Sequence, residues 1–295
     1  MLKKILLAVL LSFSLSASAA ETIYLVYGFS PASNLANIYR VMAKELNARQ
    51  SKYDFVVDVR PGAGGAIAVN HTLQNPQNSV YGTSSTFFIR ANFDKSTGYS
   101  TDSFRPVFVQ GQGSPLVLMS KKYTSLKEIK SSADFTVSIS GVGSISHIMA
   151  SQLGVSYPNI RIVNYPTLID ANRDILGQHV DTGWNWLGDV GDLIASGAVN
   201  SLGISGNNTH GKFNTLPGFE NLSSNAAIVA PMAMPEAKAE ELYALFKEVN
   251  SLDTIQSMYQ RDYYSKANLS WLETRVWYVK QVKFWKQQSE KVKPL

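Results

Sequence analysis

FVVDVRPGAGG, residues 55–65, joins an apolar, β-type segment to a glycine-rich turn. Gly62, Gly64 and Gly65 give the backbone the freedom needed at a strand end, where a tight turn or a close approach requires φ angles that a Cβ forbids. The run is not a phosphate loop, because Ile67 stands where the dinucleotide fingerprint needs a third glycine and the Gly-Lys pair of the Walker pattern is missing. A structural turn and a ligand loop both remain open.

Around this turn, short runs rich in Val, Ile and Tyr alternate with segments of helical periodicity, which predicts α/β layers with largely parallel sheets. The predicted strands are residues 23–27, 55–59, 106–110, 115–120, 135–140, 161–164, 201–205 and 226–230. Helices are predicted at 167–176, at 188–196, and where apolar residues recur every three or four positions, as at Leu35, Ile38, Met42 and Leu46. From Pro235 onward the chain is predicted to be helical.

Two apolar stripes in this C-terminal part are expected to face the core. The first consists of Leu242, Leu245, Phe246 and Val249, and the second of Leu272, Val276 and Val279. Both have the spacing of one helix face, which is why we assign them to the core.

The N-terminus has the pattern of a secretory signal peptide, residues 1–19. Lys3 and Lys4 precede an apolar core at 5–15, and Ala17-Ser18-Ala19 supplies the small residues for cleavage after Ala19. The apolar core is too short to span a bilayer comfortably, which argues against a membrane anchor. We therefore expect an exported, soluble, periplasmic protein of about 275 mature residues, a length that suits one large or two ordinary domains.

Composition excludes several classes of protein. The chain has no cysteine, which removes lipoproteins, disulfide scaffolds, thiol nucleophiles and cysteine-based metal sites. Its net charge of +5 falls to about +3 without Lys3 and Lys4, and the basic excess near the C-terminus is expected to be a solvated helix face. We expect no nucleic-acid partner, because there is no basic stripe interleaved with aromatic residues.

Three loops carry hydroxyl and amide groups after predicted strands. They are Phe29-Ser30-Pro31-Ala32-Ser33 with Asn34, Gly82-Thr83-Ser84-Ser85-Thr86, and Ser140-Gly141-Val142-Gly143-Ser144-Ile145-Ser146-His147. The last one enters a predicted helix, whose N–H groups and dipole favour a carboxylate. Ser30, Ser33 and Asn34 lie at a carboxyl strand end, where α/β proteins commonly bind ligands. A capped helix and a polar turn are the alternative interpretations.

These motifs, in this order along the chain, resemble those of the Bug/TctC family of periplasmic solute-binding receptors for tripartite tricarboxylate transporters. The turn resembles the family's Arg-Pro-Gly-Ala-Gly-Gly signature, and residues 170–181 resemble its stretch of helix, glycine and "Gln-Val-Asp". The resemblance covers essentially the whole mature chain. It implies a two-lobed α/β binding protein of type II, a Venus flytrap with the ligand cleft between lobes. We place lobe 1 at 20–118 and 226–295 and lobe 2 at 119–225.

The resemblance also implies ligand contacts in lobe 2 and points to departures from the family. A tyrosine at the position of Tyr165 often faces the ligand, and Trp184 is expected either to wall the pocket or to lie on a buried strand end. Ala36 and Asn185 stand where acids are common, so we expect the cleft to disfavour ammonium groups. The predicted ligand-binding residues are Ser30, Ser33, Asn34, Thr83, Ser84, Ser85, Gly143, Ser144, Ser146, His147, Tyr165, Trp184 and Asn185.

An enzyme is not expected. Ser144, Ser146 and His147 lack the Gly-x-Ser-x-Gly elbow of a hydrolase, and the four histidines lack zinc-site spacing. The main hypothesis is a monomeric receptor, without cofactor or metal, that captures a small organic anion. We expect a carboxylate, delivered to the membrane subunits of a transporter. A receptor that reports to a signalling system and a secreted serine hydrolase remain the alternatives.

Overall fold

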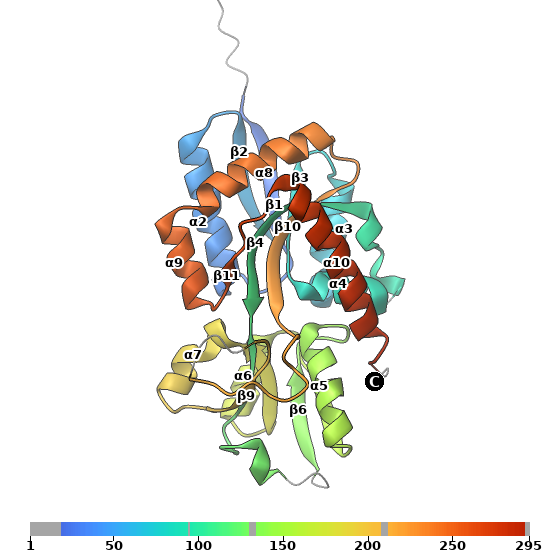
Figure 1. Ribbon diagram of the computed structural model, residues 1–295, viewed down its shortest axis with the longest axis vertical. Helices are drawn as coiled ribbons and strands as arrows, with labels where there is room; N and C mark the ends of the chain where they lie inside the picture. The colour runs from blue at the N-terminus through green and yellow to red at the C-terminus, as the bar shows by residue number, and fades with distance from the viewer. Residues whose placement is uncertain (1–18, 94, 130–133, 208–211, 293–295) are drawn as a thin grey trace, which may run out of the picture.

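The computed structural model describes residues 19–93, 95–129, 134–207 and 212–292, so the predicted signal peptide lies almost wholly outside the described residues. Two β-sheets form the centres of two lobes, one above the other in Figure 1. Helices pack on the faces of both sheets. The predicted two-lobed α/β class is confirmed, but the prediction of largely parallel sheets is wrong, because both sheets mix parallel and antiparallel pairs. Among the described residues, none of the helices combines the length and the apolar character that a membrane crossing requires.

The first lobe has a six-stranded mixed sheet. Its strands, in spatial order, are β11 (Ser265–Lys266), β4 (Phe104–Ser114), β10 (Ser224–Pro231), β3 (Ser79–Thr83), β1 (Glu21–Tyr27) and β2 (Tyr53–Val59). β1 pairs in parallel with β2 and β3, whereas β10 is antiparallel to both β3 and β4. The carboxyl ends of the parallel strands point toward the second lobe (Figure 1).

Helices cover both faces of this sheet. One apolar cluster joins it to α2 (Asn34–Arg49), α8 (Glu236–Asn250) and α9 (Asp253–Arg261). Another joins it to α3 (Ala66–Gln74), α4 (Ser85–Phe93) and α10 (Trp271–Ser289) and continues into the second lobe. The predicted apolar face of α2 is confirmed, because Leu35, Ile38, Met42 and Leu46 are all buried.

The second lobe has a five-stranded sheet. Its strands, in spatial order, are β7 (Ile160–Asn164), β6 (Phe135–Ile139), β8 (Thr182–Trp186), β5 (Leu116–Ser120) and β9 (Asn200–Ile204). Its helices are α5 (Ile145–Ser156), α6 (Leu168–Leu176) and α7 (Leu187–Ala195). Short 3-10 helices complete the described elements, at η1 (Ala63–Gly65), η2 (Lys95–Thr97), η3 (Thr101–Ser103) and η4 (Leu126–Glu128).

The chain changes sheet at two places. β4 ends at Ser114 in the first sheet, and β5 begins at Leu116 in the second. The return runs from the end of β9 to the start of β10. Reciprocal hydrogen bonds join these two connections: the N–H of Leu116 donates to the Ser205 hydroxyl at 2.9 Å, and the N–H of Ser205 donates to the Leu116 carbonyl at 2.8 Å. The predicted lobe boundaries at 118 and 225 stay a proposal, close to these crossings.

The predicted core stripe of α10 is wrong. Leu272, Val276 and Val279 are 68%, 49% and 67% exposed, and the buried face of the helix carries larger side chains instead. These are Trp277, Tyr278 and Trp285, and the smaller Thr274 and Ser289 are buried with them. Aromatic rings bury more apolar area than Leu or Val, so packing selects the aromatic face. The stripe on α8 is largely confirmed, with Leu242, Phe246 and Val249 buried and Leu245 partly buried.

Candidate functional site

The two lobes touch along a seam, which we define by three residue pairs. Asn34 at the start of α2 contacts Gly188 on α7, with its Nδ2 donating to the Gly188 carbonyl at 3.3 Å. Arg90 on α4 donates from Nη1 to the Val142 carbonyl at 2.5 Å. The rings of Phe93 and His147 meet edge to face, with centroids 5.3 Å apart. Loops that follow β1 and β6 therefore lie at this seam, where α2 and α5 begin (Figure 1).

The loop after β1 is organised around the first turn of α2. Ser33 is the N-cap, and its Oγ accepts from the N–H of Ala36 at 3.3 Å and donates to the Tyr27 hydroxyl at 3.2 Å. Ser30 Oγ accepts from the N–H of Ala32 at 3.2 Å. Asn34 reaches beyond its own loop, because its Nδ2 also donates to Asp262 Oδ1 at 2.9 Å. The predicted residues Ser30, Ser33 and Asn34 are thus brought together at one helix start.

The loop after β3 is more deeply enclosed. Thr83, Ser84 and Ser85 are all buried. The Thr83 hydroxyl donates to the Ser84 carbonyl at 2.9 Å, and the Ser85 hydroxyl donates at 3.4 Å to the carbonyl of Ser223, next to the return crossing. These two hydroxyls hold backbone in place, so their contribution to ligand contact stays a prediction.

The loop after β6 satisfies its own polar side chains. Ser144 Oγ caps α5 by accepting from the N–H of His147 at 3.2 Å, and Ser146 Oγ accepts from the N–H of Ser140 at 3.0 Å. The N–H of Gly143 donates to His147 Nδ1 at 3.1 Å. Burial lowers the pKa of His147 to about 4, so this imidazole is neutral. Helix geometry leaves the N–H groups of Ile145 and Ser146 without intrahelical acceptors, and these are the donors suited to an anion.

The remaining predicted residues are held by groups of their own lobe. The Tyr165 hydroxyl donates to Asp174 Oδ2 at 2.7 Å, and burial together with that bond raises the pKa of Tyr165 to about 12. Trp184 is buried, with its ring centroid 5.0 Å from that of Phe219. The buried Asn185 donates from Nδ2 to Asn172 Oδ1 at 2.6 Å. Their predicted ligand contacts remain untested.

Two acids at the seam were not singled out as site residues by the sequence. Asp262 follows α9, its side chain is 6% exposed, and burial and the nearby Asp189 charge raise the pKa of its carboxyl to about 7. Asp189 lies in the first turn of α7. The residue as a whole is exposed, but protein surrounds its carboxyl, and this burial raises the pKa of Asp189. The N–H of Asn34 acts in the opposite direction and lowers this pKa in part. A single aspartate at a helix end gives no sequence signal for such a placement.

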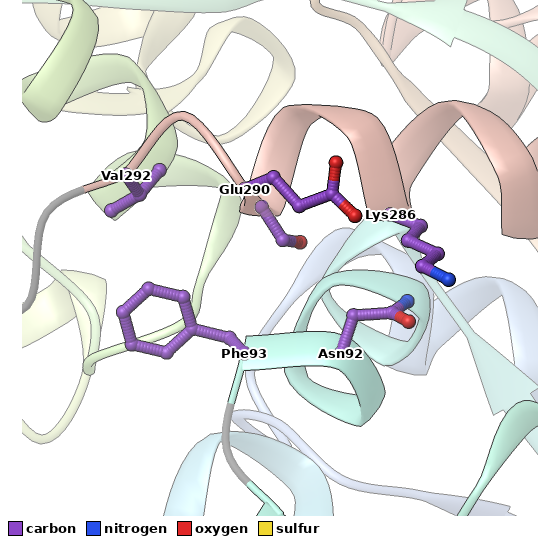
Figure 2. Close-up of a pocket in the computed structure, with 6 residues that line it drawn as sticks. Asn92, Phe93, Lys286, Glu290 and Val292 are labelled. Atoms are coloured by element: carbon purple, nitrogen blue, oxygen red, sulfur yellow. The ribbon is translucent and has the colours of Figure 1, made fainter.

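Two surface pockets are lined by other residues, although Phe93 in one contacts His147 and Ser223 in the other accepts from Ser85. One, of about 340 Å³, lies between the ends of α4 and α10 (Figure 2). Its lining residues are Asn92, Phe93, Lys286, Ser289, Glu290 and Val292. The other, of about 330 Å³, lies beside the crossings and is lined by Gln112, Gly113, Asn221, Ser223, Asn225, Gln281, Phe284 and Trp285. Within the described ranges, no group of three His, Asp or Glu residues is arranged to hold a metal ion.

Comparison with known proteins identifies the fold. No protein-family model matches the chain, and no curated protein sequence matches it. Among solved structures, the periplasmic binding protein BugD is similar with a TM-score of 0.80 and 19% identity, over 92% of this chain and 99% of that one.

Two further structures share the fold. Rpa4515 of R. palustris, determined with adipate, has a TM-score of 0.80 and 18% identity, over 93% of this chain and 98% of that one. MatC from Rhodopseudomonas palustris, with bound malate, has a TM-score of 0.78 and 15% identity, over 91% of this chain and 98% of that one. The chain therefore has the fold of these periplasmic binding proteins, which confirms at the level of fold the resemblance that its motifs indicated.

Proposed function

We propose that this chain is a periplasmic solute-binding protein that captures a small organic anion and passes it to the membrane subunits of a tripartite tricarboxylate-type transporter. One observation carries the proposal: α2 of the first lobe and α5 of the second both begin at the seam between the lobes, each with a serine N-cap. A helix N-terminus offers N–H donors and a positive dipole end to an anion. Two such ends on opposite lobes suit a ligand that is enclosed when the lobes close.

Lobe closure supplies the mechanism. A ligand that contacts both lobes binds the closed state better than the open one, and so shifts the population toward closure. The chain passes from one sheet to the other at Pro115 and before Ser224. We expect backbone rotation at these two crossings to move the lobes while each sheet keeps its own structure. A carboxylate is the class that we favour, because adipate and malate, which are bound by Rpa4515 and MatC, are both dicarboxylates.

The serine hydrolase alternative loses support from the contacts of His147. The Nδ1 of this imidazole accepts a backbone N–H, and its Nε2 is buried without a hydrogen-bond partner. Ser144 Oγ and Ser146 Oγ instead contact each other at 2.8 Å. A serine nucleophile needs a general base within hydrogen-bond reach of its hydroxyl. We therefore propose a binding role without catalysis.

Binding of a carboxylate is tested in two steps. Native mass spectrometry after gentle purification detects a co-purified acid, and thermal shift with adipate and malate then measures stabilisation. A ligand at 100 times its Kd should stabilise the protein by about 2.7 kcal/mol. Absence of any retained acid, together with no thermal shift across a panel of mono- and dicarboxylates, would refute the proposal.

Matched variants on α2 test the place of binding. Asn34→Ala removes the side-chain bonds to Asp262, within its own lobe, and to Gly188 on the other lobe. The bond between the lobes is worth about 1 kcal/mol, so the affinity for the identified acid should fall about five-fold. Asn37→Ala, on the exposed side of the same helix, should leave affinity unchanged. Equal affinities of the two variants would move the site away from the start of α2.

A further inference from the structure

Asp189 and Asp262 belong to different lobes and lie near each other where the lobes touch. Asp189 lies on α7 of the second lobe, and Asp262 follows α9 of the first. They are close enough for the charge of Asp189 to raise the pKa of Asp262. The backbones around them are also in close contact, because a Cβ added to Gly188 would lie 2.8 Å from the Cα of Asp262. The separation of the two carboxyls therefore depends on how closely the two lobes pack.

Asn34 bridges the same contact. Its Nδ2 donates both to Asp262 Oδ1 and to the carbonyl of Gly188, so one amide links the two lobes. Its backbone N–H faces the Asp189 carboxyl. Asp262 is also tied to the first crossing, since the Ser114 hydroxyl donates to the Asp262 carbonyl at 3.0 Å. Any change in the separation of the two acids is thus coupled to the position of the lobes.

Little positive charge compensates the two acids. Arg261 is the cation that lowers the pKa of Asp262, but its Nε lies 3.9 Å from Oδ1 and its side chain is 64% exposed, so solvent screens it. The other titratable groups that face the pair are tyrosines, whose pKa values are raised, chiefly by burial. They are Tyr27, Tyr259 and Tyr264. Two ionised carboxylates in this setting repel each other, and a proton shared between them removes the repulsion.

We propose that Asp189 and Asp262 form a proton-dependent latch between the lobes. With one proton on the pair, α7 stays seated on the start of α2 and the end of α9. With both carboxyls ionised, repulsion separates α7 from this position and shifts the protein toward the open state. The latch acts on lobe closure itself and does not depend on the identity of the ligand.

The direction of the pH effect follows from linkage. In the closed state the pKa of Asp262 is about 7, whereas separated lobes return it toward the usual value of about 3.9. The closed state therefore binds the proton more tightly, and closure is favoured below about pH 7 and loses this contribution as the pH rises through 7. For a single proton, the ratio of closed to open protein should fall about ten-fold between pH 6 and pH 8.

The test measures the distance between the lobes in protein without added ligand. The native chain has no cysteine, so Lys44→Cys on α2 and Ala195→Cys on α7 give two exposed, unique sites for fluorescent dyes. Energy transfer between the dyes should report about a ten-fold lower closed-to-open ratio at pH 8 than at pH 6. In Asp262→Asn the change should shrink to less than about two-fold, because a neutral amide replaces the titrating carboxyl. In Asp189→Asn it should shrink in part, because the charge of Asp189 is lost while the burial of Asp262 remains.

Asp192→Asn is the matched control, because it removes an exposed acid from the same helix and should keep the full pH response. Circular dichroism at both pH values checks that each variant is folded, and if Asp262→Asn is not, Asp189→Asn decides. An unchanged distance between pH 6 and pH 8 in the wild type would overturn the latch. A full ten-fold response retained in a folded Asp189→Asn or Asp262→Asn would overturn it equally.

Discussion

Gly143→Leu should hold the lobes apart, and Gly141→Leu should not. Both glycines have positive φ values, 76° and 98°, so both substitutions carry the same kind of backbone cost, about 1 to 2 kcal/mol. The difference lies in the space around each Cβ. At Gly143 a Cβ would lie 3.2 Å from Arg90 Cγ and 3.3 Å from Phe93 Cδ1 on the other lobe, whereas at Gly141 it would meet nothing within 4 Å.

The extra cost at Gly143 can be estimated from this crowding. The Cβ alone is already crowded against Arg90 and Phe93, and the Cγ and Cδ atoms of leucine need further space, so overpacking of about 1 to 3 kcal/mol is expected. Opening of the lobes relieves it, because α4 and α5 belong to different lobes. The closed-to-open ratio of Gly143→Leu should therefore fall by about five- to 150-fold relative to Gly141→Leu.

Energy transfer between dyes on α2 and α7, as above, measures the closed fraction, and urea unfolding measures stability. The two variants should have similar free energies of unfolding and different closed fractions. Weaker binding of the identified acid by Gly143→Leu alone would follow from the same cause. Equal closed fractions and equal affinities would refute the inference that α5 closes against α4.

Three further predictions follow from burial and charge. Trp285→Ala should lower the free energy of unfolding by about 3 to 5 kcal/mol in a urea titration. Val279→Ser, on the exposed face of the same helix, should change it by less than about 0.5 kcal/mol. A larger loss at Val279 would show that this face is covered in solution. His147→Asn keeps an acceptor for the N–H of Gly143 but removes the imidazole that titrates. The pKa of His147 is about 4 in the folded state and about 6.5 in the unfolded state, so the unfolded state binds more protons between these values. From pH 7 to pH 5 the free energy of unfolding of the wild type should therefore fall by up to about 2 kcal/mol, whereas that of the variant should not show this fall. Parallel pH profiles of the two proteins would contradict this. In a thermal-shift screen of matched acids, compounds without an α-amino group should stabilise the protein more, since Ala36 and Asn185 provide no carboxylate; the opposite order would indicate that Asp189 pairs with the ammonium.

Local patterns predicted most of the elements because they are set by local physics. The helix at 168–176 was expected at 167–176, and the one at 187–195 at 188–196, each within one residue. The stripe on α10 failed for a reason that periodicity cannot detect. Both sides of this helix carry apolar residues at helical spacing, and only the neighbouring aromatic rings, such as Phe88 against Trp277, decide which side is buried.

The seam illustrates the same limit for function. The capped helix start at Ser144 was recognisable because a hydroxyl before an apolar helical pattern has a local meaning. Asp262 had none, since its partner Asn34 lies 228 positions earlier in the chain and the two meet only when both ends of the chain enter one lobe. The raised pKa of this carboxyl is therefore a property of the folded chain, through burial and the nearby charge of Asp189, and not of the residue alone. For that reason a pH dependence of lobe closure, if measured, would report on the tertiary contact directly, in a way that no property of the unfolded chain could imitate.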